Sequence, residues 1–532
     1  MLKNMFKLLT LASILLLIGT VAVIIHLKVD TSDDSSRVVI GRMNDSLSLD
    51  PAITSDTESF QITANIYETL IISAQGGTSL MPGLAESWKV SDDGLTWHFK
   101  IRKGIKFHDG TLLNAHVVAF NFQRWMDPNS PYHTGDFVYW NYSFGGFPGI
   151  VRTVTALSNE TLEIVLTEPY APFLSTLSMP AFGIASQTAL LKYNDALKTH
   201  PVGTGPFIFK SWEKNDRIIL KRNDNYWNGR AKAPEIEFRV LPSGADKIAL
   251  LKSGEVNIID QLSVEEVDAV NADDTLRLYY RPFINIGYLA LNNKIPPFND
   301  ARVRKAISLL IDKESLLNDS YKALFRSANS FLPPVILGYH EGIKSDLVNI
   351  EEAKSLLAQS GYPNGFDVTL WVMDRPRNYF PNPSEIGNSI KSQLSKANIN
   401  VTMNIITWDR FIEDIRLGTH QMALTGWNGD IADPDNFLYT LFASADVKSQ
   451  LSFNHSGYEN ERVDELLMQA RRVTDEDFRI TLYREIQEII YADAASIPLM
   501  HTMTAIGTDI RVKGFEPHIT GEEIFMNLEI VP

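Results

Sequence analysis

Hydrophobic and polar positions alternate along several segments in the first half of the chain. This period of two occurs in residues 96–106, 161–166 and 217–221, and it is typical of strands with one buried face. In the second half, Asn299 or Asp300 precedes a segment whose apolar residues recur at the i, i+3, i+4, i+7 spacing of a buried helix face. The pattern therefore predicts antiparallel sheet in the first half and core-facing helices in the second.

Strand and helix patterns then alternate along one continuous part of the second half. The pattern predicts strands at 367–372, 399–406 and 421–427, and helices at 384–394 and 410–417. Connections of this kind, in which a helix joins two strands, give parallel strands. The second half is therefore predicted to contain an α/β lobe with a βαβαβ unit.

Two charged residues follow the ends of two of these strands. Arg375 lies three residues after Val372, and Asp430 lies three residues after Trp427. Because ligands of open α/β sheets bind beyond the carboxyl ends of the strands, both side chains are candidates for a binding site. Neighbouring strands are ~4.8 Å apart, so an arginine and an aspartate there could hold the two ends of a short zwitterion. The alternative is that Arg375 and Asp430 pair with each other or cap loops.

Composition and motifs narrow the possible functions. The chain has 532 residues, a net charge of −15 and no cysteine. The acidic balance argues against a phosphate-binding surface, so no nucleic acid is expected as a partner, and the missing cysteines exclude disulfides and thiolate metal sites. The motifs GxSxG, HExxH and GxxxxGKS/T are absent, and Asp430, Asp433 and Asp435 lack the glycine and glutamate of a calcium loop. No catalytic residue, metal site or cofactor is predicted, and the chain is not expected to be an enzyme.

The N-terminal segment is strongly apolar. Residues 8–25 carry no charge and follow Lys3 and Lys7. A helix of this length, at about 1.5 Å rise per residue, spans about 27 Å and matches the hydrocarbon core of a membrane. We predict that residues 1–37 hold an uncleaved transmembrane anchor and a linker, with a cleaved export signal as the alternative. The lysines before the span place the rest of the chain outside the cytoplasm, in the periplasm or on the outer face of the membrane.

Four segments carry a resemblance to a known family. They are residues 80–118 (LMPGLAESWKVSDDGLTWHFKIRKGIKFHDGTLLNAHVV), 201–207 (PVGTGPF), 298–311 (FNDARVRKAISLLI) and 426–437 (GWNGDIADPDNF). These segments resemble the extracytoplasmic solute-binding proteins of ABC importers for peptides, opines and nickel, which form family 5. The combination of RPRNYFPNP, which begins at Arg375, with GWNGD is most similar to the dipeptide-binding branch.

The resemblance implies a fold and a division into domains. The fold is α/β and two-lobed, the periplasmic-binding-protein fold of class II and cluster C, with an extra inserted subdomain and, in this chain, an N-terminal transmembrane helix. After residues 1–37, the implied domains are 38–69, 211–287 and 501–532 for lobe I, 70–210 for the inserted subdomain, and 288–500 for lobe II.

The resemblance also implies a binding site for a short peptide. Asp430 would hold the ammonium group of the ligand, and Arg375 would hold its carboxylate. Trp427 and Gly426 would line the pocket, and Thr54 would contribute from lobe I.

Arg377 departs from the pattern of the dipeptide-binding branch, which commonly has a tyrosine at this position. The arginine would add a positive charge near the carboxylate end of the ligand. We therefore expect Arg377 to belong to the ligand-binding residues and to shift the substrate preference.

The function implied by the resemblance is transport without chemistry. The chain, expected to be a monomer, would capture short peptides, dipeptides above all, between its lobes. It would deliver them to an ABC permease heterodimer driven by cytoplasmic ATPases. Two alternatives stay open. The first is a carrier for another solute: a longer or antimicrobial peptide, haem or its precursor, or a metal chelate. The second is a membrane-tethered sensor or chaperone.

Overall fold

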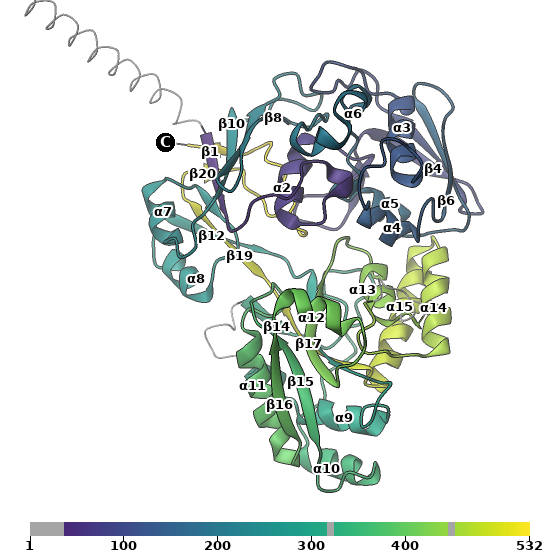
Figure 1. Cartoon of the computed structure of the whole chain (residues 1–532), viewed down its shortest axis with the longest axis vertical. Coiled ribbons are helices and arrows are strands. Elements are labelled where there is room, and N and C mark those ends of the chain that lie inside the picture. Colours follow the sequence, from purple (N-terminus) through teal and green to yellow (C-terminus); the bar gives the residue numbers. More distant parts are fainter. Residues whose placement is uncertain (1–36, 317–323, 445–452, 532) are drawn as a thin grey trace, which may run out of the picture.

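The computed structural model describes residues 37–316, 324–444 and 453–531, which form two lobes (Figure 1). This arrangement agrees with the predicted two-lobed α/β fold. The predicted anchor at residues 8–25 lies outside the described residues. Within the described ranges, no helix combines the length and the apolar character needed to cross a membrane.

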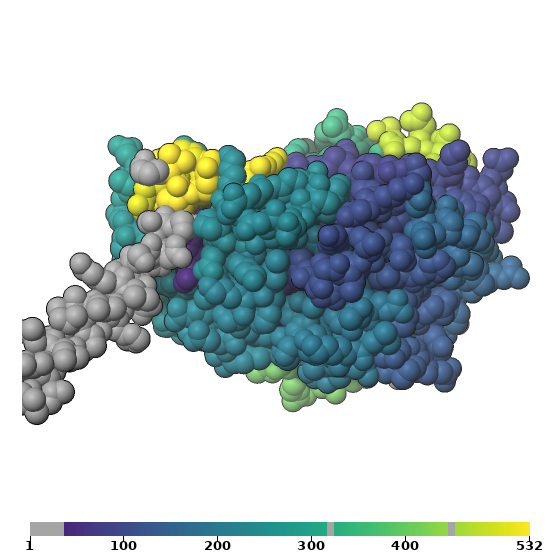
Figure 2. All heavy atoms as spheres, turned by 90° about the horizontal axis from the view of Figure 1, so that it is seen from above, coloured from purple at the N-terminus to yellow at the C-terminus, as the bar shows by residue number. Residues whose placement is uncertain are grey.

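Lobe I is built on a seven-stranded sheet. The order of its strands is β12 (Leu276–Arg281), β19 (Thr504–Asp509), β11 (Ile258–Ile259), β1 (Arg37–Arg42), β10 (Glu235–Val240), β9 (Arg217–Arg222) and β8 (Phe207–Glu213). The helices of this lobe are α2 (Thr57–Ile66), α7 (Lys247–Ser253) and α8 (Val264–Asn271). Strand β1 is parallel to β10 and β11, and the other neighbouring pairs are antiparallel. Figure 2 shows the C-terminal residues, in yellow, lying beside the teal residues of this lobe.

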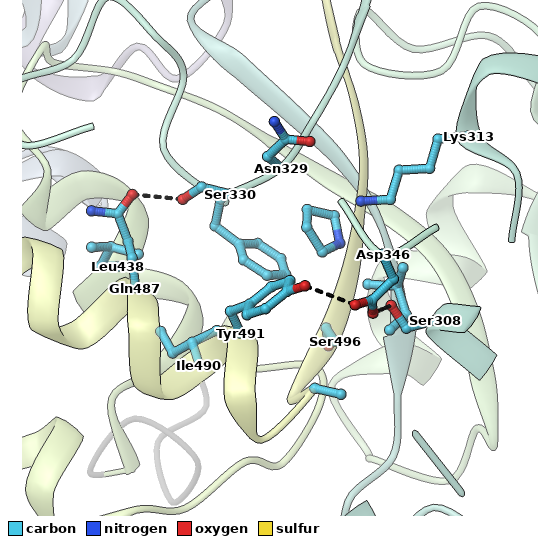
Figure 3. A pocket seen from close by; sticks show the side chains of 14 residues that line it. Ser308, Lys313, Asn329, Ser330, Asp346, Leu438, Gln487, Ile490, Tyr491 and Ser496 are labelled. Atoms are coloured by element: carbon cyan, nitrogen blue, oxygen red, sulfur yellow. Dashed lines mark hydrogen bonds between the residues drawn. The ribbon is translucent and has the colours of Figure 1, made fainter. Parts of the chain in front are cut away.

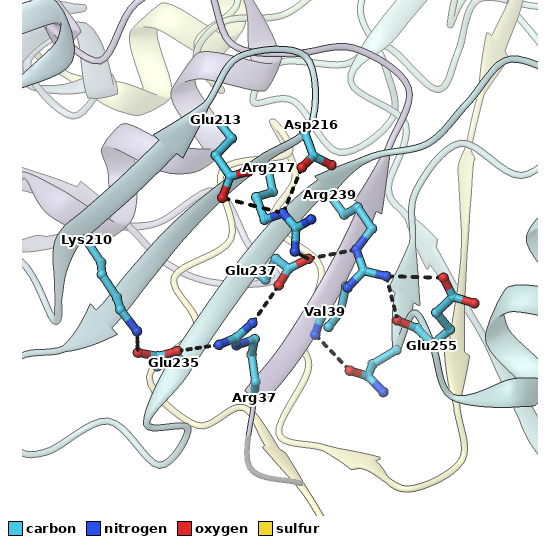
Figure 4. A network of polar contacts seen from close by, with 11 residues as sticks. Arg37, Val39, Lys210, Glu213, Asp216, Arg217, Glu235, Glu237, Arg239 and Glu255 are labelled. Carbon is cyan, nitrogen blue, oxygen red and sulfur yellow. Dashed lines mark hydrogen bonds and ion pairs between the residues drawn. The ribbon is translucent and has the colours of Figure 1, made fainter. Parts of the chain in front are cut away.

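Charged side chains cover part of one face of the lobe I sheet (Figure 4). Glu237, on β10, is fully buried and accepts hydrogen bonds from Arg37 at 2.9 Å and from Arg239 at 2.7 Å. A buried carboxylate is tolerated when cations pair with it and donate hydrogen bonds. The pair between Arg37 and Glu237 therefore holds β1 against β10.

The inserted subdomain lies between α2 and β8 in the sequence. Its four-stranded antiparallel sheet has the order β4 (Ala85–Val90), β5 (Thr96–Ile101), β7 (Thr161–Leu166) and β6 (Val151–Ala156). The other elements are β2 (Ile71–Ser73), β3 (Leu80–Pro82), α3 (Ala115–Met126), α4 (Val138–Phe144), α5 (Phe173–Leu177) and α6 (Gln187–Tyr193). The strand predicted over 96–106 ends at Ile101, because Gly104 adopts a left-handed φ of 76° and turns the chain.

Lobe II is built on a six-stranded sheet. The order of its strands is β14 (Phe325–Ser327), β18 (Ser496–Thr502), β13 (Asn285–Leu291), β17 (Met422–Asn428), β15 (Asp367–Met373) and β16 (Asn400–Ile406). The helices are α9 (Ala301–Leu310), α10 (Ile350–Gln359), α11 (Pro383–Leu394), α12 (Trp408–Ile415), α13 (Asp435–Phe442), α14 (Glu461–Arg472) and α15 (Glu476–Ala492). Strand β15 is parallel to both β16 and β17, which confirms the predicted βαβαβ unit.

Two segments carry the chain between the lobes. Strand β12 of lobe I leads into β13 of lobe II, and β18 of lobe II leads back into β19 of lobe I. The Asn285 side chain links the two segments, because its Nδ2 donates to the Thr502 carbonyl at 2.9 Å and its Oδ1 accepts the Thr502 N–H at 2.9 Å. Short paired segments of this kind are where hinge motions of two lobes take place.

Candidate functional site

The two charged residues predicted from the sequence follow neighbouring strands of the lobe II sheet. Arg375 comes two residues after the end of β15, and Asp430 comes two residues after the end of β17. The two strands are parallel and paired through Leu370 and Met422. Both residues therefore leave the sheet at the same edge, as predicted.

Asp430 lies between the lobes. Its Oδ1 accepts a hydrogen bond from the Tyr139 hydroxyl of α4 in the inserted subdomain, at 3.1 Å, and its backbone N–H donates to Asn436 Oδ1 at 2.9 Å. Within the described residues, no basic side chain forms an ion pair with this carboxylate. Burial raises the pKa of Asp430 to about 6, because the charged form loses contact with water. Within the described part of the chain, the site thus holds a carboxyl group without a counter-ion.

The loop after β15 is packed onto the sheet through two glycines. A Cβ at Gly426 would lie 2.3 Å from Cδ2 of Tyr379, and a Cβ at Gly287 would lie 2.6 Å from Cε1 of Phe380. The rings of this loop therefore occupy the space that side chains on β17 and β13 would fill. Gly426 is predicted to line the pocket. In the structure the ring of Tyr379 packs against Gly426, and this contact fixes the position of the loop.

Arg375 is about half exposed on this loop. Its Nε lies 3.4 Å from Asp374 Oδ1, and its side-chain exposure is 52%. The structure shows no contact between Arg375 and Asp430, so the alternative in which the two pair with each other does not hold. The guanidinium of Arg375 is accessible to a ligand.

Arg377 occupies a different position from its neighbour Arg375. Its guanidinium carbon lies 3.9 Å from the centre of the Trp408 ring, a cation–π contact. Arg377 and Asn378 line a cavity of about 330 Å³ between the lobes, next to the crossing residues Thr502 and Thr504. The structure therefore places Arg377 at the hinge side of the space between the lobes.

The other two predicted residues are held by their own neighbours. Trp427 donates from Nε1 to Asn436 Oδ1 at 3.1 Å, and its ring centre lies 4.8 Å from that of Phe453. Thr54 is 2% exposed, and its hydroxyl donates to the carbonyls of Ser48 and Asp50. The hydroxyl of Thr54 is therefore engaged within lobe I, and a ligand contact of this residue would have to come from its backbone.

The inserted subdomain contacts lobe II around Asp430. Besides the bond from Tyr139, the Tyr142 hydroxyl lies 2.5 Å from Thr440 Oγ1, and Arg472 pairs with Glu168 at 2.9 Å. In Figure 1, α4 and α5 face the end of lobe II that carries α13 and α14. A cavity of about 370 Å³ lies at this junction, and Asp430 forms part of its wall. Sequence patterns did not indicate Tyr139, because its function depends on how the two lobes face each other.

A further cavity lies within lobe II and is too small for a solute. Figure 3 shows Lys313 and Asp346 in its wall. The Nζ of Lys313 donates to the Ala328 carbonyl at 2.7 Å, and Asp346 accepts hydrogen bonds from Ser308 and Tyr491, both at 2.7 Å. Its volume of about 20 Å³ has room for about one water molecule. These groups stabilise lobe II.

Known proteins are similar to this chain over most of its length. The chain is 31% identical to Heme-binding protein A of Haemophilus influenzae over 499 residues, which cover 91% of this chain and 90% of the relative. It is 30% identical to the Dipeptide-binding protein of Escherichia coli over 489 residues, which cover 90% of this chain and 91% of the relative. The solved structure of the periplasmic binding protein DppA from Helicobacter pylori, in complex with peptide STSA, superimposes with a TM-score of 0.79. It is 33% identical, and the match covers 93% of this chain and 98% of DppA.

A model of a protein family also matches the chain. The model of the bacterial extracellular solute-binding proteins, family 5 Middle, matches residues 79–449, which is more than half of the chain. The matched range includes the four-stranded sheet of the inserted subdomain and both strands that precede Arg375 and Asp430. The chain belongs to family 5 of the bacterial extracellular solute-binding proteins.

Proposed function

We propose that this protein is the extracytoplasmic substrate-binding component of an ABC importer and that it captures short peptides, dipeptides above all. The peptide binds between the lobes, which close around it by rotation at the two crossings. The loaded protein then delivers the peptide to the membrane permease. The similarity to dipeptide-binding proteins and to a peptide complex supports this ligand class.

One observation carries the proposal: the carboxylate of Asp430 lies between the lobes without a cationic partner in the described structure, and its pKa is raised by burial. A buried charge is stable when an opposite charge pairs with it. The ammonium group of a peptide supplies that charge. A hydrogen bond to a charged group contributes about 1.5 to 3 kcal/mol, so this end of the peptide is a major part of the affinity.

Arg375 is proposed as the partner of the peptide carboxylate. It follows the strand next to the one that leads to Asp430, and its guanidinium is half exposed. The bidentate geometry of arginine suits a carboxylate. The additional positive charge of Arg377 lies on the same loop and would strengthen the attraction for this end of the ligand.

Calorimetry with matched dipeptides tests both roles. Ala-Ala, its N-acetyl form and its C-terminal amide are titrated into the ligand-free protein and into the variants Asp430→Asn and Arg375→Ala. We expect Asp430→Asn to weaken Ala-Ala binding tenfold or more, and the N-acetyl peptide to bind both proteins equally weakly. Arg375→Ala should weaken Ala-Ala but not the amide. Unchanged affinity of Asp430→Asn for Ala-Ala, or equal losses of Arg375→Ala for the acid and the amide, would contradict the assigned roles.

Haem is a second candidate ligand, because a relative named Heme-binding protein A is as similar to this chain as the dipeptide-binding protein. The carboxylate of Asp430, which pairs with no cation among the described residues, favours the peptide. A titration with haemin, followed by its Soret absorbance, separates the two ligands. Saturable haemin binding that Ala-Ala fails to displace would favour the haem carrier.

A further inference from the structure

A cavity of about 210 Å³ lies between lobe I and the inserted subdomain and is distinct from the cavity in whose wall Asp430 lies. It is bordered by α2, by the hairpin of β2 and β3, and by the C-terminal segment. Three acidic or histidine side chains reach it: Glu68, His518 and Glu522. None of the predicted ligand-binding residues lines this cavity.

Two of these three groups are held by the protein itself. Glu68 accepts hydrogen bonds from Thr204 Oγ1 at 2.7 Å, from the Tyr226 hydroxyl at 2.7 Å and from Trp227 Nε1 at 3.0 Å. Burial lowers the pKa of His518 to about 4, so this ring is neutral at pH 7. Glu68 is therefore held by hydrogen bonds within the protein, and His518 carries no charge at pH 7.

Glu522 is different. Its Oε2 accepts a hydrogen bond from Thr520 Oγ1 at 2.8 Å, and no basic residue pairs with it in the described part of the chain. Arg281, the basic residue near this segment, is bound to Asp260 at 3.0 Å and to Glu523 at 2.6 Å. Burial, with a smaller contribution from the charge of Asp430, raises the pKa of Glu522 to about 8. At pH 7 this carboxyl group is therefore mostly protonated in the empty cavity, and a cation that enters the cavity would favour its ionised form.

The position of Glu522 links the cavity to the site at Asp430. The phenol of Tyr139, which donates to Asp430, also interacts electrostatically with Glu522. Two carboxyl groups without counter-ions in the described structure therefore lie near one tyrosine, one contributed by each lobe. A ligand with two positive charges would pair with both once Glu522 has lost its proton.

The remaining wall of the cavity suits an alkyl chain. Ile72, Met81, Ile524 and Met526 contribute apolar surface. A water molecule occupies about 30 Å³ in the liquid, so a cavity of about 210 Å³ holds a group of several non-hydrogen atoms. Arg102 also approaches, but it stacks on Trp227 and donates to the Gly83 carbonyl, and its charge acts on Glu68.

We propose that this cavity is a pocket for a cationic alkyl group, an alkylammonium or an alkylguanidinium, with Glu522 as the residue that determines its specificity. In a peptide whose α-ammonium binds Asp430, this group is the side chain of an N-terminal lysine or arginine. That second statement rests on the proposed function, whereas the first concerns the cavity alone.

Calorimetry with a matched pair of peptides tests the assignment in the complete protein. Lys-Ala and norleucine-Ala have side chains of similar length and differ in the charge. We expect wild-type protein to bind Lys-Ala at least tenfold more tightly than norleucine-Ala, and Glu522→Gln to reduce this preference to about twofold or less. Norleucine-Ala should bind both proteins with similar affinity. Glu529→Gln, which changes a surface residue paired with Lys232, is the control and should keep the preference.

Two outcomes would overturn the assignment: wild-type protein that does not prefer Lys-Ala, and a preference that survives in Glu522→Gln. If neither peptide binds, the proposed peptide function fails, and the cavity is then tested with n-pentylammonium and n-pentanol by saturation-transfer NMR. A signal for pentylammonium that exceeds the signal for pentanol and disappears in Glu522→Gln supports the pocket. Equal signals, or a signal that Glu522→Gln leaves unchanged, refute it.

Discussion

Replacing Asp430 by asparagine separates binding from stability, because the two are expected to change in opposite directions. Asparagine keeps the shape of the side chain and an oxygen that can accept the hydrogen bond of Tyr139. It removes the negative charge that lacks a partner in the described structure. The variant should therefore bind peptides more weakly, yet be more stable than the wild type in the ligand-free state at neutral pH.

The magnitude follows from the pKa of Asp430. Burial raises this pKa from 3.8 to about 6, and each pKa unit corresponds to about 1.4 kcal/mol. Because the folded protein binds the proton more tightly than the unfolded chain, the contribution of this group to stability is present below pH 4. It is lost as the pH rises to about 6. Above pH 6 the ionised carboxylate costs the wild type roughly 3 kcal/mol of unfolding free energy, and the asparagine variant avoids this cost.

Urea denaturation of ligand-free protein, followed by tryptophan fluorescence and circular dichroism, measures the difference. Both proteins are unfolded and refolded during purification so that bound ligand is removed. We expect similar free energies of unfolding at pH 4 and a variant that is more stable by about 2 to 3 kcal/mol at pH 7.5. A variant that is less stable than the wild type at pH 7.5, or a difference that does not depend on pH, would refute the reasoning.

Two further predictions concern packing and the lobe I sheet. Gly426→Ala places a Cβ against the Tyr379 ring, so it should destabilise the protein by about 1 to 3 kcal/mol and weaken peptide binding by displacing the loop that carries Arg375. Gly77→Ala is the control, because no atom lies within 4 Å of its added Cβ, and it should change neither stability nor binding. Equal midpoints of urea denaturation for the two variants would contradict this prediction. Glu237→Gln leaves Arg37 and Arg239 without their buried partner and should lower the free energy of unfolding by about 2 to 3 kcal/mol. Glu255 is exposed, so Glu255→Gln is the control and should change the free energy of unfolding by no more than about 0.5 kcal/mol. Thermal denaturation measures both variants, and a Glu237→Gln variant as stable as the wild type would show that the ion pairs contribute little.

The sequence was sufficient to predict the parts of the fold that depend on local periodicity. Strand β7 has the predicted bounds, and of the two residues predicted at the start of α9, Asn299 and Asp300, the side chain of Asp300 caps the helix. The parallel arrangement of β15 and β17 followed from the helical connections between strands, and this placed Arg375 and Asp430 at one edge. These features are determined by neighbours in the sequence or by the handedness and length of a connection.

The contacts of the site could not be predicted in the same way. That Gly426 lies under Tyr379 depends on how a loop folds back onto a strand some fifty residues later in the sequence. That the hydroxyl of Thr54 is buried depends on the carbonyls of Ser48 and Asp50, which a periodic pattern does not reveal. In both cases a small residue has a packing or hydrogen-bonding function that its sequence neighbours do not indicate.

Tyr139 explains how the lobes can meet at Asp430 without satisfying its charge. A lysine or arginine from the inserted subdomain would also bridge the lobes, but it would neutralise the carboxylate and leave nothing for the ammonium group of a ligand. The phenol donates a single neutral hydrogen bond at 3.1 Å, so the negative charge persists. Glu522 follows the same principle, because the group that donates to it is the hydroxyl of Thr520. Contacts made through neutral hydroxyls therefore order both carboxyl groups and leave each of them able to pair with a cation of the ligand.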